Sequence, residues 1–377
     1  MLDTLFVRAE RQSALLQRAW PEHVAAQCAS WVRAVCRGEA PTLTFSYRRP
    51  PVLTELRAAL SWVTCELSAG NVSEALADRG SDRARLLVLA ALYAERAAEL
   101  ELDAALAEHI GRPGFAELAR RRHAPRGTPD WPMAEQLARD WARAPPAAPS
   151  GQAPEALFAS DDSGAPQSLL RLISEQIGRL QLAVRVSVVH ELASRAATGD
   201  GVIYVRAGVR LNAREALRIA RHEVLGHALP RARALRLPLG LGRVGCAGSA
   251  EEEEGRALLI EQRCGDLGPE RRRELGLRHL TALAVADGAD AHDCLRLLAG
   301  FDCEPAEAVS LYARCARGSS GAAGGLCREL EYLPAWLRVS AAFNADPALE
   351  DWLERGRWSL HAARALGAYA TLAGTGS

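Results

Sequence analysis

Lysine is absent from the sequence, because all 46 basic residues other than histidine are arginine. Its absence excludes Schiff-base catalysis and the lysine of a phosphate-binding P-loop. An excess of charge is also lacking, since the 46 basic residues are balanced by 46 acidic ones. The chain therefore has no general positive field to hold nucleic acid or an anionic membrane, and we expect neither among its partners.

Long apolar runs are missing as well. The longest apolar stretch, which begins near Leu86, is far shorter than the roughly 20 residues that cross a bilayer. The N-terminal residues include Asp3 and no apolar run of the kind found in secretory signals. The nine cysteines form no C-x-x-C pair, and their odd number predicts reduced thiols. These features predict a cytoplasmic protein.

The chain of 377 residues is long enough for two domains. In residues 1–142 apolar side chains recur every three or four positions, which predicts packed helices. Prolines interrupt this pattern in residues 38–51 and predict an extended segment there. Residues 143–167 are rich in proline, alanine, glycine and serine, which predicts a linker or a long surface loop. We place the domain boundary there and expect a second domain at residues 168–377.

The second domain mixes helices with a few strands. A helix is predicted near residues 168–180, and two β-rich runs at residues 182–189 and 201–208 are expected to pair antiparallel. Asn212 and Glu215 form a helix-capping pattern that opens a helix ending at Pro230. The same pattern at Ser249 and Glu252 opens a further helix. The predicted fold class is α+β and mainly helical, with a small antiparallel sheet.

The helix before Pro230 contains a variant of the zinc-peptidase motif H-E-x-x-H, in which the histidines are five residues apart. On a regular α-helix His222 and His227 would point about 140° away from each other. Two histidines and a carboxylate can hold zinc, and Glu223 would be the base beside its water. The spacing therefore predicts a widened or broken helix, most readily at Gly226. The alternative is that these are capping and surface polar groups.

The third ligand is expected on the next helix, where residues 251–254 are all glutamate. Acids in a first helical turn are favoured by the helix dipole alone, so most of them need no further role. Periodicity does not separate Glu253 from Glu254. The order of a β-hairpin, a ligand helix and an acid-bearing helix is that of gluzincin peptidases, and by analogy it predicts a zincin-like catalytic domain.

The two helices together resemble a known family. "RAGVRLNAREALRIARHEVLGH" and "EEGRALLIEQ", with "PTLTFSY", "ARCARG" and "LCRELEYL" elsewhere, are similar to the QEGLA-motif proteins. These are called flavohaemoglobin expression-modulating in bacteria and are related to the microtubule-associated tyrosine carboxypeptidases, which have an H-E-x-x-x-H motif. The resemblance extends over most of the chain.

The resemblance implies residue roles. It makes His222 and His227 ligands of one zinc ion per chain, Glu223 the catalytic acid and base, and Glu254 the third ligand. It thereby leaves Glu253 as a surface residue. Two positions depart from the family pattern: Arg256 replaces the usual leucine, and Arg328 replaces lysine. The second change keeps the positive charge but alters its geometry.

A carboxypeptidase also needs a cation for the free carboxylate of its substrate and a donor for the oxyanion. Arg317 and Arg328 are the candidates for carboxylate binding, although Arg317 could instead favour a helix C-terminus. Tyr332 is the candidate oxyanion donor, although buried tyrosines more often only form a structural hydrogen bond. The sequence thus predicts a zinc-dependent metallopeptidase, a carboxypeptidase that acts on a peptide or protein C-terminus. The alternative is a non-catalytic regulatory or interaction protein on the same scaffold.

Overall fold

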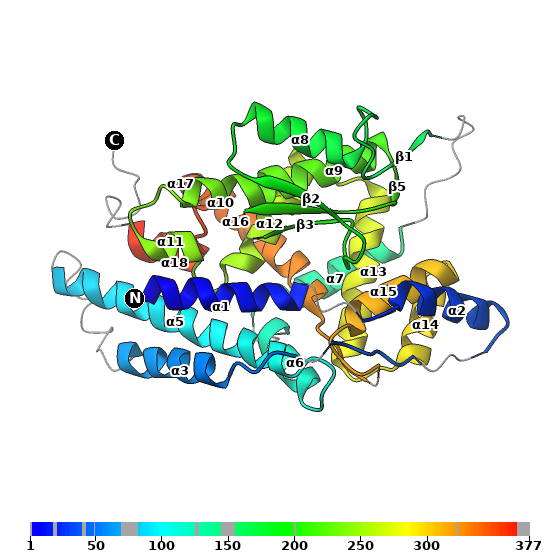
Figure 1. The fold of residues 1–377 in the computed structure, drawn as a ribbon, viewed down its shortest axis with the longest axis horizontal. Helices are drawn as coiled ribbons and strands as arrows, with labels where there is room; N and C mark the ends of the chain where they lie inside the picture. The colour runs from blue at the N-terminus through cyan, green and yellow to red at the C-terminus, as the bar shows by residue number, and fades with distance from the viewer. Residues whose placement is uncertain are drawn as a thin grey trace.

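The computed structural model describes residues 2–17, 21–39, 43–48, 50–68, 82–124, 128–144, 155–199, 201–321 and 323–367. Within these residues the fold is mainly helical with two small sheets, which confirms the predicted α+β class (Figure 1). No helix among the described residues is long and apolar enough to cross a membrane.

The N-terminal part consists of helices, as predicted. They are α1 (Leu2–Gln17), α2 (Val24–Cys36), α3 (Thr54–Ser68), α5 (Asp82–Glu108), α6 (Phe115–His123) and α7 (Asp130–Ala142). Helices α1 and α3 both pack against α5, whereas α2 lies on the other side of the molecule beside α15 (Pro305–Ala316) (Figure 1). The predicted extended segment lies between α2 and α3, and its residues 43–48 contain no helix; residues 40–42 and 49 lie outside the described part.

The larger sheet has three strands in the order β2-β4-β3: β2 (Arg185–Val189), β4 (Val202–Arg206) and β3 (Ala196–Gly199). Strands β2 and β4 are parallel, so the predicted antiparallel pairing of these two runs is wrong. The reason is that β3 lies between them in sequence and forms a hairpin with β4. The chain therefore reverses twice between β2 and β4, and β3 becomes an edge strand.

A second, two-stranded sheet pairs β1 (Leu157–Ala159) with β5 (Arg210–Asn212) in antiparallel register. Strand β1 falls inside the segment predicted as a linker, whose residues 145–154 lie outside the described part. Helix α8 (Leu169–Arg179) begins as predicted, with Ser168 capping it through the backbone N–H of Arg171.

The remaining elements follow β5 along the chain. They are α9 (Ala213–Arg221), the π-helix η1 (His222–Ala228), α10 (Leu229–Ala234), α11 (Gly240–Val244), α12 (Ser249–Arg263), α13 (Pro269–Ala286), α14 (Ala291–Ala299), α15, the 3₁₀-helix η2 (Arg328–Leu330), α16 (Tyr332–Ala345), α17 (Ala348–Arg355) and α18 (Leu360–Leu366). Helix α12 runs through the middle of the molecule and packs between η1 and α16 (Figure 1).

Residues from both sides of the predicted domain boundary share hydrophobic cores. Val88 and Leu92 of α5 pack with Leu241 and Trp358, and other N-terminal helices contribute to cores built mainly from α13 to α15. The core around η1 is different, because it joins α8 and α9 to the three-stranded sheet. This arrangement fixes η1 between the sheet and α12.

Candidate metal centre

The ligand helix departs from α geometry where the spacing of its histidines requires it. Asn212 caps α9 by accepting a hydrogen bond from the backbone N–H of Glu215 (2.8 Å), as predicted. The chain then continues as the π-helix η1, which contains His222 and His227. In a π-helix hydrogen bonds join residues five apart, so the two side chains reach the same side. Their Nε2 atoms are 3.3 Å apart.

Pro230 gives this distortion a local cause. Proline has no N–H, so it cannot donate to the carbonyl of Gly226 as an α-helix requires, or to that of Leu225 as a π-helix requires. Both carbonyls instead accept hydrogen bonds from Nη2 of Arg256, at 2.7 and 2.6 Å. Arg256 of α12 therefore links α12 to η1.

Two glycines bring the three helices of the centre together. A Cβ atom on Gly226 would lie 2.6 Å from the Cβ atom of Ala257 in α12. A Cβ atom on Gly255 would lie 2.5 Å from the carbonyl oxygen of Ala335 in α16. Neither distance is sterically possible, so both positions need glycine for helix packing. Gly226 thus serves the contact with α12 as well as the π-helix.

Glu254 completes a triad with the two histidines. Its Oε2 atom is 3.4 Å from Nε2 of His222 and 3.5 Å from Nε2 of His227. Three corners of a tetrahedron around a zinc ion are about 3.4 Å apart when the bonds are near 2.1 Å. Oε2 is buried and has no hydrogen-bond partner. The three atoms therefore fit a tetrahedral metal ion with one position left open.

A carboxylate lies against Nδ1 of each imidazole, the ring nitrogen that does not face the triad. Nδ1 of His222 is 2.7 Å from Oε1 of Glu261, and Nδ1 of His227 is 3.3 Å from Oε2 of Glu253. A nitrogen that faces a carboxylate holds the proton, which leaves Nε2 of a neutral ring free to bind a metal. This is the usual arrangement around histidine ligands in metal sites.

Arginines neutralise these outer carboxylates. Glu253 pairs with Arg231 (2.8 Å) and Arg357 (3.1 Å), and Glu261 pairs with Arg271 (2.9 Å). The expectation that Glu253 is a surface residue is therefore wrong: its side chain is only 5% exposed. Acids in a first turn are explained by the helix dipole only when they face solvent, and Glu253 faces the core.

The charges of the centre favour a bound cation. Burial raises the pKa of Glu254, but His227, His222 and Arg328 outweigh it and hold that pKa well below its usual range. Burial lowers the pKa of His222, but the nearby carboxylates of Glu254 and Glu261 outweigh burial and raise the pKa to about 9. The pKa of His227 is raised in the same way, mainly by Glu254. In the metal-free protein the carboxylates thus draw positive charge onto the imidazoles, the charge that a metal ion would supply.

Glu223 is buried on η1 and directly follows His222 in the sequence. One of its carboxylate oxygens, Oε2, accepts a hydrogen bond from the hydroxyl of Thr198 in β3 at 2.8 Å. The edge of the sheet therefore touches the residue that the sequence assigns as the base.

The remaining predicted site residues differ in their surroundings. Nη2 of Arg328 is 3.3 Å from Oε1 of Glu254, so this arginine adjoins the triad. Burial and the charge of Glu254 raise the pKa of Tyr332 to about 12. Arg317 is buried and pairs with Glu329 (2.8 Å), and no contact between Arg317 and the triad is found among the described residues. The structure thus places Arg328 beside Glu254 but does not do so for Arg317.

The predicted cap of α12 is wrong. Ser249 is the first residue of the helix, and Gly248, with a φ of 73°, precedes it without a side-chain cap. The carboxylate of Glu252 instead accepts a hydrogen bond from the backbone N–H of Leu360.

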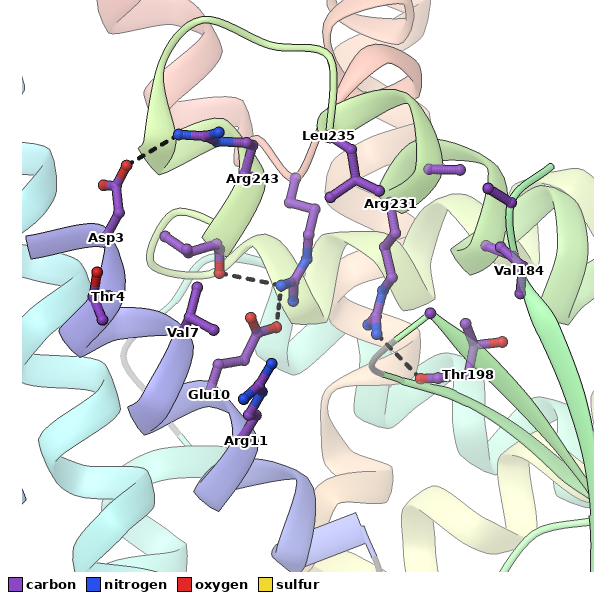
Figure 2. A pocket seen from close by; sticks show the side chains of 16 residues that line it. Asp3, Thr4, Val7, Glu10, Arg11, Val184, Thr198, Arg231, Leu235 and Arg243 are labelled. Atoms are coloured by element: carbon purple, nitrogen blue, oxygen red, sulfur yellow. Dashed lines mark hydrogen bonds and ion pairs between the residues drawn. The ribbon is translucent and has the colours of Figure 1, made fainter.

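A pocket of about 630 Å³ lies between α1, α10 and the end of the sheet (Figure 2). Thr198 and Arg231 line it on the side of the metal centre, and Glu10 and Arg11 line it from α1. Glu10 pairs with Arg357, which also holds Glu253. Arg231 and Arg357 line the pocket and pair with Glu253, which contacts His227. These two arginines therefore lie between the pocket and the triad.

Sequence reasoning missed Glu261, the supporting role of Glu253, and Thr198. Glu261 follows Glu254 by seven residues, two helical turns, so the shared face was a usable signal. Thr198 had no such signal, because its contact with Glu223 depends on the position of an unpredicted strand.

Comparison with known proteins finds a matching family. The model of a family described as microtubule-associated tyrosine carboxypeptidase matches residues 47–371. The match includes η1 and α12, whereas α1 lies before it. No curated protein and no solved structure matches the chain.

Proposed function

Because the chain belongs to the microtubule-associated tyrosine carboxypeptidase family, we propose that it is a zinc-dependent carboxypeptidase that removes a C-terminal residue from a peptide or protein. The observation that supports this most is the triad of His222, His227 and Glu254, whose ligand atoms have the separations of a tetrahedral site. The buried Glu223 next to it adds a base.

In this proposal the residues of the chain have separate tasks. His222, His227 and Glu254 hold the metal, and Glu253 and Glu261 orient the imidazoles. A bound zinc ion acts as a Lewis acid and makes water nucleophilic near neutral pH. Glu223 accepts the proton of the attacking water and returns it to the leaving amine.

Two neighbours of Glu254 would contact the substrate. We propose that Arg328 binds the free carboxylate of the substrate and that Tyr332 donates to the oxyanion. Arg328 already contacts Glu254, so it lies near the reacting atoms. Arg317 would first have to leave its buried pair with Glu329, which makes it the weaker candidate.

The test measures zinc content and the rate of amino-acid release separately. Purified protein should contain about one zinc per chain, and it should release the terminal amino acid from peptides with varied C-termini. Glu223→Gln should keep the zinc but slow release by about 10² to 10⁴, because the amide cannot accept a proton. A wild-type protein that binds zinc and releases nothing would favour the regulatory alternative. Equal release by both proteins would show that Glu223 is not the base.

A further inference from the structure

The contact between the sheet and Glu223 has a function of its own. We infer that Thr198 is a positioning residue, whose hydroxyl holds the carboxylate of Glu223 in the orientation needed for proton transfer; this inference rests on the proposed function. Its hydroxyl is 2.8 Å from Oε2 of Glu223, and both side chains are buried, at 7% exposure each.

The hydroxyl of Thr198 has two acceptors on Glu223, Oε2 at 2.8 Å and the backbone carbonyl oxygen at 3.3 Å, and the shorter contact is the one to the carboxylate. A carboxylate can only accept hydrogen bonds, so Thr198 is the donor. Because Oε2 receives this bond, Oε1 is the oxygen left to take a proton from water. Hydrogen bonds to a charged group are among the stronger ones in a protein interior. A glutamate side chain otherwise has several rotamers, and this bond selects one of them.

The backbone of Thr198 is also fixed by a hydrogen bond. Its backbone carbonyl accepts a hydrogen bond from Nη1 of Arg231 at 3.1 Å, and Figure 2 shows Arg231 reaching from α10 to this point. The Nε and Nη2 atoms of the same guanidinium donate to Oε2 of Glu253, at 3.0 and 2.8 Å. Glu253 in turn contacts His227. A continuous set of polar contacts thus joins the base to a metal ligand through β3.

The position of Thr198 on the sheet makes this contact possible. Strand β3 is one of the two edge strands of this sheet, so its outer side is not occupied by another described strand. Its register with β4 places Thr198 opposite Ile203, a fully buried core residue. The hydrophobic core under β4 therefore sets where the hydroxyl lies. Positioning by a strand is more rigid than positioning by a loop.

Valine and serine substitutions test the inference. Thr198→Val keeps the shape of the side chain but removes the donor, and we expect kcat to fall about tenfold or more with little change in KM. Thr198→Ser keeps the donor and should restore kcat to within a few-fold of wild type. Thr281→Val is the matched control, because it removes a buried hydroxyl that bonds only Leu277 within α13.

Two readouts besides activity accompany the rates. Zinc content should stay near one per chain in all three variants, because among the described residues the side chain of Thr198 forms hydrogen bonds with Glu223 and not with the triad. Crystal structures should show the carboxylate of Glu223 turned away from β3 in Thr198→Val and in place in Thr198→Ser. Wild-type kcat in Thr198→Val, or an unmoved carboxylate, would overturn the inference while leaving the proposed function intact. An inactive wild type would instead overturn the proposed function, and the inference with it.

Discussion

At the scale of single residues, the centre depends on which acid of the run at residues 251–254 performs which task. Glu254 has an unpartnered oxygen aimed at two imidazole nitrogens, whereas both oxygens of Glu253 are engaged by arginines and His227. The free oxygen of Glu254 suits a metal ligand, whereas the fully engaged carboxylate of Glu253 suits a residue that orients a ligand. The neighbours therefore differ in role although both are buried.

Glutamine substitutions should separate these roles. Glu254→Gln should lose most zinc affinity, because it removes a charged ligand. Glu253→Gln should lower the affinity by about 10- to 100-fold, as loss of outer support around a metal ligand typically does. Glu175→Gln, in an exposed pair with Arg171, is the control and should bind zinc normally. Zinc titration of the purified variants measures all three, and normal binding by Glu254→Gln would remove it from the triad.

The sequence points to the candidate ligands but not to the carboxylates that contact them. His222, His227 and Glu223 follow from one motif, and Glu254 followed from the family resemblance. The supporting role of Glu253 depends on Arg231 and Arg357, which lie 22 and 104 residues away in the chain. No local pattern specifies partners at such separations. For this reason the sequence alone predicts a surface position for Glu253.

At the scale of elements, the π-helix was predictable and the sheet was not. Two ligands five residues apart require a distortion, and only a π-type turn or a break supplies it. Strand β3 has the sequence AATG, which lacks the β-branched and aromatic alternation typical of strands. Its pairing with β4 overrides this weak propensity. Because β3 was missed, the orientation of β2 and β4 was predicted wrongly.

The π-helix should depend on Arg256 because of Pro230. Arg256→Met keeps much of the apolar stem but leaves the carbonyls of Leu225 and Gly226 without this donor, which should cost about 2 kcal/mol of unfolding free energy. Pro230→Ala adds an N–H that can bond one of these carbonyls. The methionine substitution should therefore cost about 1 kcal/mol less in a Pro230→Ala background. Denaturant unfolding of wild type, the two single variants and the double variant measures the coupling free energy between the two substitutions. If the two free-energy changes simply add, the proposed link between Arg256 and Pro230 is wrong.

At the scale of the whole molecule, the two halves of the chain form shared cores. The composition of residues 143–167 predicted a boundary, and that division stays a prediction. The contacts across it were not predictable, because apolar periodicity shows that a helix has a buried face but not which helix covers it. His279 of α13 illustrates this: its ring lies 6.0 Å from that of Trp131 in α7, between centroids.

His279 should make the stability of the molecule depend on pH. It is fully buried, neither ring nitrogen has a hydrogen-bond partner, and burial lowers its pKa to about 4. An unfolded histidine has a pKa near 6.5, so between pH 6.5 and 4 the unfolded chain binds a proton that the folded chain does not. Folding stability therefore falls as the pH falls through this range. The loss is about 1.4 kcal/mol per pH unit at most, and roughly 3 kcal/mol in total.

A leucine variant should remove this contribution. His279→Leu has a similar volume and introduces no unpaired polar atom, so it should fold at pH 7 with equal or greater stability. Its unfolding free energy should fall less between pH 6.5 and 4 than that of wild type, because the residue no longer titrates in the unfolded chain. His292→Leu, at an exposed position of α14, is the control and should keep the wild-type slope. Chemical denaturation across this pH range measures the difference between the curves. If the unfolding free energies of His279→Leu and wild type change equally with pH, this histidine accepts its proton in the folded state. The contact between α7 and α13 would then accommodate a charged imidazole.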